Sequence, residues 1–180
     1  NEFGRLYLNS EGTLSDVAML TVALQFSVIY LQLNKSILNS ILKDVLENNR
    51  YALSESVKIM FLQFSVMVVI LAGIYFFFNY LVGDDYIHAK ELTYYFIIAH
   101  FLQSLSVLPS TYLNKYRKNY FRLWVVIFCA VVNVCSVIVF YPSYGLVTIP
   151  IASVFSFLFY SILLFIVVGV LSNRNIKKIN

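Results

Sequence analysis

The stretch that decides the fold runs from Leu123 to Asn173 and reads LWVVIFCAVVNVCSVIVFYPSYGLVTIPIASVFSFLFYSILLFIVVGVLSN. Its 51 residues include no Asp, Glu, Lys or Arg. As one straight helix it would measure roughly 76 Å, whereas the hydrocarbon core of a bilayer is about 30 Å thick. The stretch therefore predicts two membrane helices that double back at 141–145, where Pro142 lacks an amide proton and Gly145 has a permissive backbone.

The whole chain is too apolar for a water-soluble protein. Of its 180 residues, 60% are hydrophobic and 12% are charged, and that charged share is about half of the usual ~25%. A bilayer must solvate most of such a surface. The length allows about five or six crossings with short loops, which leaves no room for a soluble catalytic domain.

Three further intervals without charged residues are each long enough for one helical crossing. They lie between Asp16 and Lys35, between Lys58 and Asp84, and between Glu91 and Lys115. Continuous apolar runs such as MVVIL at 67–71 lack the alternation that membrane strands need. We therefore expect an all-α integral membrane protein, a single transmembrane unit over 1–180, with five spans at about 14–34, 57–82, 92–113, 121–141 and 146–171.

The lysines and arginines indicate the orientation. Eleven of the thirteen lie in the segments 34–58, 114–122 and 172–180, and six of the nine acids lie on the opposite side. Cytoplasmic loops carry the excess of cations, so we expect these segments and the C-terminus to be cytoplasmic and the N-terminal end to be outside. Because the cations are scattered over three flanking segments, they do not indicate a nucleic-acid surface.

No residue pattern indicates an enzyme, a cofactor or a metal site. The six glycines are too dispersed for a phosphate-binding loop, and His88 and His100 are not spaced with carboxylates or thiols. Cys129 and Cys135 are six residues apart, so on one helix they point about 240° apart and are interpreted as packing residues. Any transport must draw its energy from an ion gradient, the substrate's own gradient or a partner.

Neutral polar residues recur at helical spacing inside the spans. Buried polar groups are costly in hydrocarbon, so these residues should face other helices or water. Two interpretations stay open: interhelical hydrogen bonds worth about 0.6 kcal/mol each, or a cavity for a polar solute. His100 is the only ionisable side chain well within a span, and an imidazole titrates near physiological pH. The candidate cavity-lining residues are Gln25, Gln32, His100, Gln103 and Asn133.

Four short features carry a family resemblance. The segment LVGDDYIHA at 81–89 resembles the external loop of the polysaccharide flippases in the MATE-like exporter superfamily. The segment YGLV at 144–147 resembles the entry into the last core helix of the same flippases. SDVA at 15–18 is similar to the entry into their eighth helix, and Asn133 lies where they often have Asn. The TIP segment at 148–150 departs from their usual Gly-Ala-Ala, so close helix packing there is expected to differ.

The resemblance implies the architecture of a half-transporter. Such proteins usually have twelve or more helices in two pseudo-symmetric halves, and the five spans would be helices eight to twelve, most of one half. The chain begins with Asn and shows no signal-peptide pattern, so we expect a fragment without its N-terminal half. The implied Wzx-type function is to move undecaprenyl-diphosphate-linked oligosaccharide repeat units across the bacterial inner membrane for O-antigen or capsule assembly.

The resemblance also implies partners and a site for the diphosphate. The partners are the lipid-linked oligosaccharide, the bilayer, the missing N-terminal half and the polysaccharide polymerase machinery, with no nucleic acid. The diphosphate candidates at the cytoplasmic mouth are Lys35, Lys43, Lys115, Arg117 and Arg122, which also fit ordinary positive-inside topology. Two alternatives stay open: an ion-coupled drug or metabolite exporter of the same superfamily, although no carboxylate lies in mid-span, and a membrane assembly subunit without transport of its own.

Overall fold

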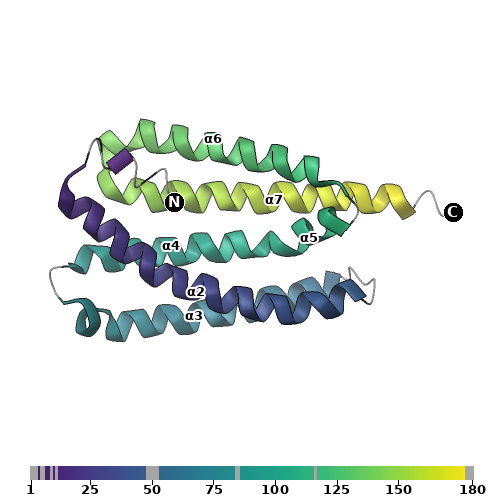
Figure 1. The fold of residues 1–180 in the computed structure, drawn as a ribbon, viewed down its shortest axis with the longest axis horizontal. Coiled ribbons are helices and arrows are strands. Elements are labelled where there is room, and N and C mark those ends of the chain that lie inside the picture. Colours follow the sequence, from purple (N-terminus) through teal and green to yellow (C-terminus); the bar gives the residue numbers. More distant parts are fainter. Residues whose placement is uncertain are drawn as a thin grey trace.

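The computed structural model describes residues 4, 7, 8, 10, 12–47, 53–83, 86–115 and 117–176, and their side chains except in 42–56 and beyond 171. All regular secondary structure in these residues is helical (Figure 1), as the sequence predicts. The elements are α2 (Leu14–Glu47), α3 (Leu53–Val82), α4 (Ile87–Leu105), α5 (Val107–Lys115), α6 (Asn119–Tyr144), the short 3-10 helix η2 (Gly145–Val147) and α7 (Thr148–Ile176).

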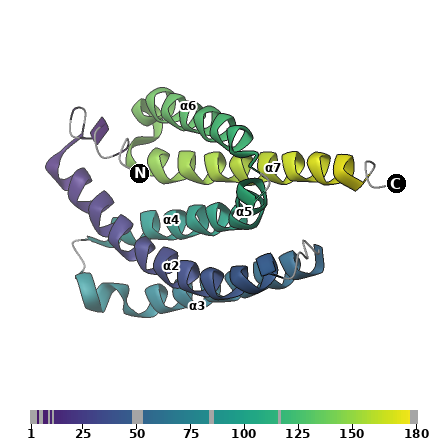
Figure 2. The same cartoon turned by 45° about the vertical axis from the view of Figure 1, so that its right-hand side comes forward.

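Four helical stretches of the described chain are long and apolar enough to cross a membrane: Leu14–Ile41, Val57–Val82, Ile87–Lys115 and Asn119–Leu171. The last stretch has 53 residues and comprises α6, η2 and the larger part of α7. The two long helices lie side by side and run in opposite directions in both views (Figures 1 and 2). The stretch therefore doubles back, as its length requires.

The reversal takes place at Gly145. Its backbone has φ 62° and ψ −147°, a combination that side-chain-bearing residues rarely adopt. The prediction of Pro142 as part of the break is wrong, because α6 continues through Pro142 to Tyr144. The missing amide proton of Pro142 removes one hydrogen bond from the last turn of α6, whereas the positive φ of Gly145 changes the direction of the chain.

The span predicted at 92–113 is divided into two helices. The helix α4 ends at Leu105, α5 begins at Val107, and Ser106 lies between them. Pro109 explains the interruption, because it has no N–H to donate to the carbonyl of Leu105 and it restricts the backbone before it. At the junction, both the hydroxyl and the N–H of Ser106 donate to the Gln103 carbonyl, at 2.5 and 3.2 Å.

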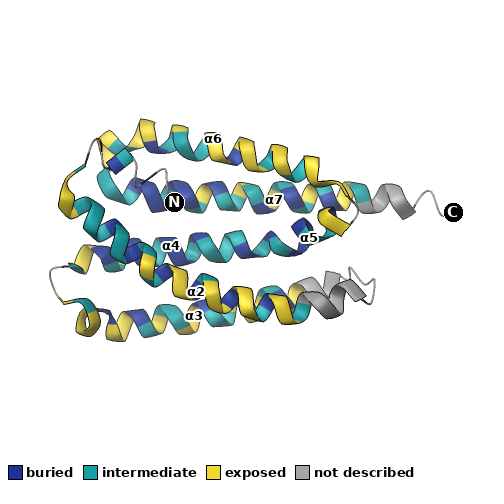
Figure 3. Ribbon diagram, in the orientation of Figure 1, coloured by how far each residue is buried: buried dark blue, intermediate teal, exposed yellow. Residues whose placement is uncertain are grey.

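The helix α4 is the centre of the bundle and packs against α2, α3 and α7, and α6 covers α7 (Figure 1). Two main clusters of buried apolar side chains fill the interior, one around Leu20, Phe96 and Ile149 and one around Tyr30, Phe78 and Ile97. The outer faces of α3 and α6 are largely exposed (Figure 3). They carry large apolar side chains such as Phe61, Phe76, Trp124, Phe128 and Val139. Hydrocarbon solvates such faces, so the structure is that of a membrane protein.

Candidate functional site

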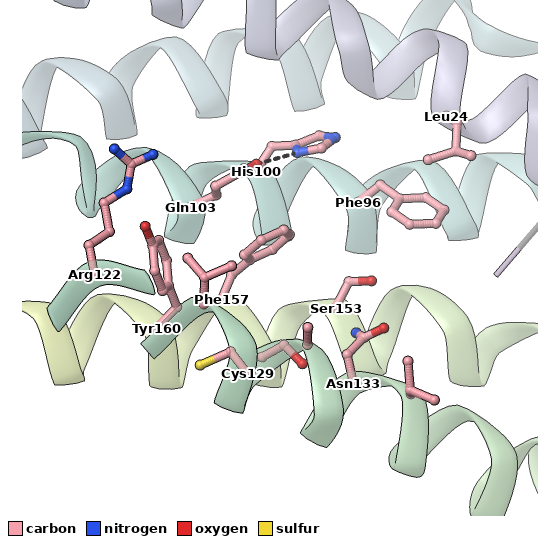
Figure 4. Close-up of a pocket in the computed structure, with 14 residues that line it drawn as sticks. Leu24, Phe96, His100, Gln103, Arg122, Cys129, Asn133, Ser153, Phe157 and Tyr160 are labelled. Atoms are coloured by element: carbon pink, nitrogen blue, oxygen red, sulfur yellow. Dashed lines mark hydrogen bonds between the residues drawn. The ribbon is translucent and has the colours of Figure 1, made fainter. Parts of the chain in front are cut away.

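A cavity of about 470 Å³ lies between α4, α6 and α7, with one residue of α2 at its edge. In Figure 4, Asn133, Phe157 and Tyr160 point from α6 and α7 toward α4, on which Gln103 and His100 lie. The cavity is lined by Leu24, Phe96, His100, Gln103, Arg122, Val126, Cys129, Ala130, Asn133, Val134, Ser153, Ser156, Phe157 and Tyr160. Polar and apolar groups therefore alternate on its walls.

Neutral hydrogen-bonding groups occupy the middle of this cavity. On α4, Nδ1 of His100 lies 3.2 Å from Oε1 of Gln103 (Figure 4), a pair one helical turn apart. Nε2 of His100 and the hydroxyl of Ser156 are buried and make no hydrogen bond within the described residues. Asn133 contributes a carboxamide from α6. The carboxamides of Gln103 and Asn133 can donate to and accept from a polar solute or water in the cavity.

A second cavity of about 270 Å³ lies beside the first, toward α5. Gln103, Arg122 and Tyr160 line both cavities, so the two adjoin, and we call them together the groove. The second cavity has the more polar lining, which includes Asn34, Lys35, Gln103, Ser104, Ser106, Ser110, Thr111, Asn114, Arg122 and Tyr160. The hydroxyls of Ser110 and Tyr160 lie 3.5 Å apart across the α5–α7 contact.

The structure brings three of the five predicted cavity residues together. His100, Gln103 and Asn133 line the first cavity, whereas Gln25 and Gln32 line neither cavity and are exposed. Each glutamine directly follows a residue that does line the groove, Leu24 or Leu31. One position along a helix turns the side chain by about 100°, which carries both carboxamides out of the groove.

Two of the five predicted diphosphate residues lie at the groove. Lys35 of α2 and Arg122 of α6 both line the second cavity. Lys115 and Arg117 are exposed and line neither cavity. The side chain of Lys43 lies outside the described residues. The second cavity of the groove thus has two cations in its lining, and the first has mainly neutral groups.

Several residues of the groove were not singled out from the sequence. Ser110, Asn114 and Tyr160 belong to polar patterns of their helices, but one sequence does not show which faces of separate helices meet. The sequence did not indicate Asn34 as a groove residue, because it lies at the end of a charge-free interval. In the structure Asn34 is only 1% exposed, and its Oδ1 has no hydrogen-bond partner in the described chain.

The side chains of the groove offer groups that can bind a polar or phosphorylated molecule. Its lining includes no carboxylate, and no group of three or more metal-ligating residues occurs in the described part of the chain. Hydroxyl, carboxamide and imidazole groups suit sugar hydroxyls. Arginine and lysine suit phosphate oxygens, arginine through its planar pair of donors.

Comparison with known proteins identifies no relative. No protein-family model, no curated protein and no solved structure matches this chain. The functional conclusion therefore rests on the groove and on the sequence features described above.

Proposed function

We propose that this chain forms one half of a polysaccharide flippase, a transporter that moves a lipid-linked oligosaccharide across the membrane. The observation that carries the proposal is the groove of two adjoining cavities, with His100, Gln103 and Asn133 lining the first and Lys35 and Arg122 lining the second. A pathway for a sugar chain with a phosphate anchor needs both kinds of group.

The proposal includes five membrane crossings, with α6 and α7 as separate spans. Each of these helices has more than 25 residues, and about 20 are sufficient for a crossing. Positive-inside topology then supports a cytoplasmic location for the α2–α3 loop, the α5–α6 loop and the C-terminus. In this orientation Lys35 and Arg122 lie at the cytoplasmic side of the groove, where the substrate is made.

Each part of the substrate has a corresponding part of the groove. The diphosphate would bind between Lys35 and Arg122, with hydroxyls of Ser110 and Thr111 as further donors. The sugars would pass Gln103 and the groups beyond it. The prenyl tail would stay in the hydrocarbon, which requires the groove to be open to the bilayer at some stage of the cycle.

A second half would complete the pathway. The groove is formed by one set of five helices, and transporters of this class rock two halves around a central site. The resemblance of the segments at 15–18, 81–89 and 144–147 supports an N-terminal half of the same protein as that partner. The bacterial inner membrane and the polysaccharide polymerase machinery belong to the same proposal. No feature of the groove favours an ion-coupled exporter, because its lining includes no carboxylate.

The test is complementation of a bacterium that lacks its own flippase. The chain is co-expressed with a candidate N-terminal half, and surface polysaccharide is measured. We expect the two halves together to restore polysaccharide and the chain alone to give none. Full restoration by residues 1–180 alone would show a small transporter of another kind, and no restoration by the complete protein would refute the flippase function.

A further inference from the structure

Two carboxamides are buried between α2 and α3, and several of their polar atoms have no hydrogen-bond partner in the described chain. Asn34 of α2 and Gln63 of α3 are each only 1% exposed. Oδ1 of Asn34 and both Oε1 and Nε2 of Gln63 are buried and make no hydrogen bond within the described residues. Unsatisfied polar atoms are costly in a protein interior, so each of these three atoms requires a partner.

The two carboxamides lie at the same level of the bundle. The helices α2 and α3 lie side by side and run in opposite directions (Figures 1 and 2). Two buried apolar clusters contain residues of both helices, one with Tyr30 and Met67 and the other with Leu38 and Ile59. Asn34 is four residues from both of these α2 residues, and Gln63 is four residues from both α3 residues. Asn34 and Gln63 therefore form one polar layer of the α2–α3 contact, between two apolar layers.

Neighbouring side chains satisfy only the amide nitrogen of Asn34. Its Nδ2 donates to the Tyr30 hydroxyl at 3.4 Å. Tyr30 is in turn hydrogen-bonded to Ser104, whose hydroxyl donates to the Phe101 carbonyl at 2.6 Å. This series of bonds leaves Oδ1 of Asn34 in need of a donor.

Burial and chemistry restrict what can satisfy the three atoms. A lipid chain or a further helix cannot reach side chains that are covered on all sides. A direct bond from Nε2 of Gln63 to Oδ1 of Asn34 would leave Oε1 of Gln63 without a donor, and a cation would leave Nε2 without an acceptor. A water molecule donates twice and also accepts, and buried waters typically make about three hydrogen bonds. One water can therefore satisfy all three atoms.

The groove gives water a route to this layer. Asn34 and Ser104 also line the second cavity, which has a volume of about 270 Å³. One water takes up only ~30 Å³ of the liquid. Gln63 lines neither cavity of the groove, so Asn34 lies between it and the second cavity.

We propose that Asn34 and Gln63 form a binding site for a water molecule between α2 and α3, which the water enters from the second cavity. The site extends the polar region of the groove into the α2–α3 contact. The proposal does not depend on what the groove carries, because it rests on burial, position and hydrogen bonding.

Hydroxyl-radical labelling of the full chain in lipid nanodiscs tests the proposal. X-ray pulses form the radicals from water, so a bound water modifies side chains that radicals from bulk solvent do not reach. Tyr30 and Phe78 belong to the same apolar cluster and are 0% and 1% exposed. Tyr30 is one turn from Asn34, whereas Phe78 is about four turns along α3 from Gln63. With each rate divided by that of the same residue in the denatured chain, we expect at least severalfold faster labelling of Tyr30. Equal protection of Tyr30 and Phe78 would overturn the proposal.

Substitutions distinguish this site from water that stays in the second cavity. Gln63→Leu keeps a similar volume but removes two of the three polar atoms, so labelling of Tyr30 should fall severalfold. Asn34→Leu is an independent variant and should have the same effect. Ser65→Ala is the control, because the Ser65 hydroxyl donates within α3 to the Phe61 carbonyl at 3.0 Å. Undiminished labelling of Tyr30 in Gln63→Leu, or an equal fall in Ser65→Ala, would overturn the proposal.

Discussion

Gln103 is the side chain on which the proposed function depends most. It lines both cavities and lies 3.2 Å from Nδ1 of His100, so it can fix the imidazole tautomer and also meet a sugar hydroxyl. The sequence placed these two residues on one face of a helix because they are three positions apart. It could not show that Asn133 and Tyr160, from two other helices, complete the same wall.

Replacement of His100 or Gln103 by Ala should lower surface polysaccharide by about 2- to 10-fold, the loss expected for one hydrogen bond in the pathway. The amount of membrane-inserted chain should not change, because groove-facing groups contribute little to packing. Thr93→Ala is the matched control, since the hydroxyl of Thr93 is buried and donates only within α4, to the Ala89 carbonyl at 2.7 Å. Normal output per inserted molecule in both groove variants would remove the two residues from the site.

Arg122, in the first turn of α6, and Arg117, just before α6, form a matched pair of cations. Arg122 lines both cavities, whereas Arg117 is exposed and lines neither. Arg122→Gln should lower polysaccharide output about tenfold or more, because a charge-assisted bond to phosphate is lost. Arg117→Gln removes the same charge just before α6 and should have little effect. Equal effects of the two replacements would mean that both arginines only help to set the membrane orientation of the chain.

The lengths of the intervals without charged residues predicted the helices of this chain well, but they predicted the interruptions of those helices less well. The intervals ending at Lys35 and Lys115 indicated α2 and the α4–α5 pair, because crossing length depends only on composition. The break at Ser106 was missed, although Pro109 gives a local reason for it. A proline inside a membrane helix is compatible with a kink, a break or a continuous helix, and tertiary packing decides among them.

The α6–α7 reversal makes a direct prediction about Gly145. Gly145→Ala should destabilise the folded chain by about 1–3 kcal/mol, since a Cβ is strained at this backbone conformation although no atom lies within 4 Å of its position. Gly73→Ala is the control, because Gly73 lies inside α3 with equal space around it, and Ala is favoured there by up to about 1 kcal/mol. Thermal unfolding in detergent compares the two. Equal melting temperatures would show that the turn does not need its positive φ.

The distribution of cations predicts the orientation of the whole molecule. In a chain without native cysteines, Ser143→Cys should react with a membrane-impermeant thiol reagent added outside intact cells, and Asn119→Cys should not. Both positions are exposed, at opposite ends of α6. The sequence also predicts an external location for Asp85 and a cytoplasmic location for Asn48. These two loop positions are not among the residues that the structure describes. Labelling of Asn119→Cys in intact cells would reverse the orientation.

The arrangement of the helices was less predictable from the sequence than the helices themselves. Which polar faces meet depends on how helices rotate against each other, and a single sequence contains this information only indirectly. Gln25 and His100 show the result: both are polar residues in mid-span, but one lies on an outer face and the other on the wall of the groove.

The reactivity of Asn133→Cys tests the proposed flippase function most directly. The variant is made in a chain without native cysteines and is co-expressed with the second half. Asn133 lines the groove, whereas Val131, two residues away, is 56% exposed on the outer face of α6. We predict that Asn133→Cys reacts with a water-soluble thiol reagent, that Val131→Cys does not, and that lipid-linked oligosaccharide slows the reaction of Asn133→Cys. Equal reactivity at the two positions, or a reaction that the lipid-linked oligosaccharide leaves unchanged, would contradict a groove that carries this substrate.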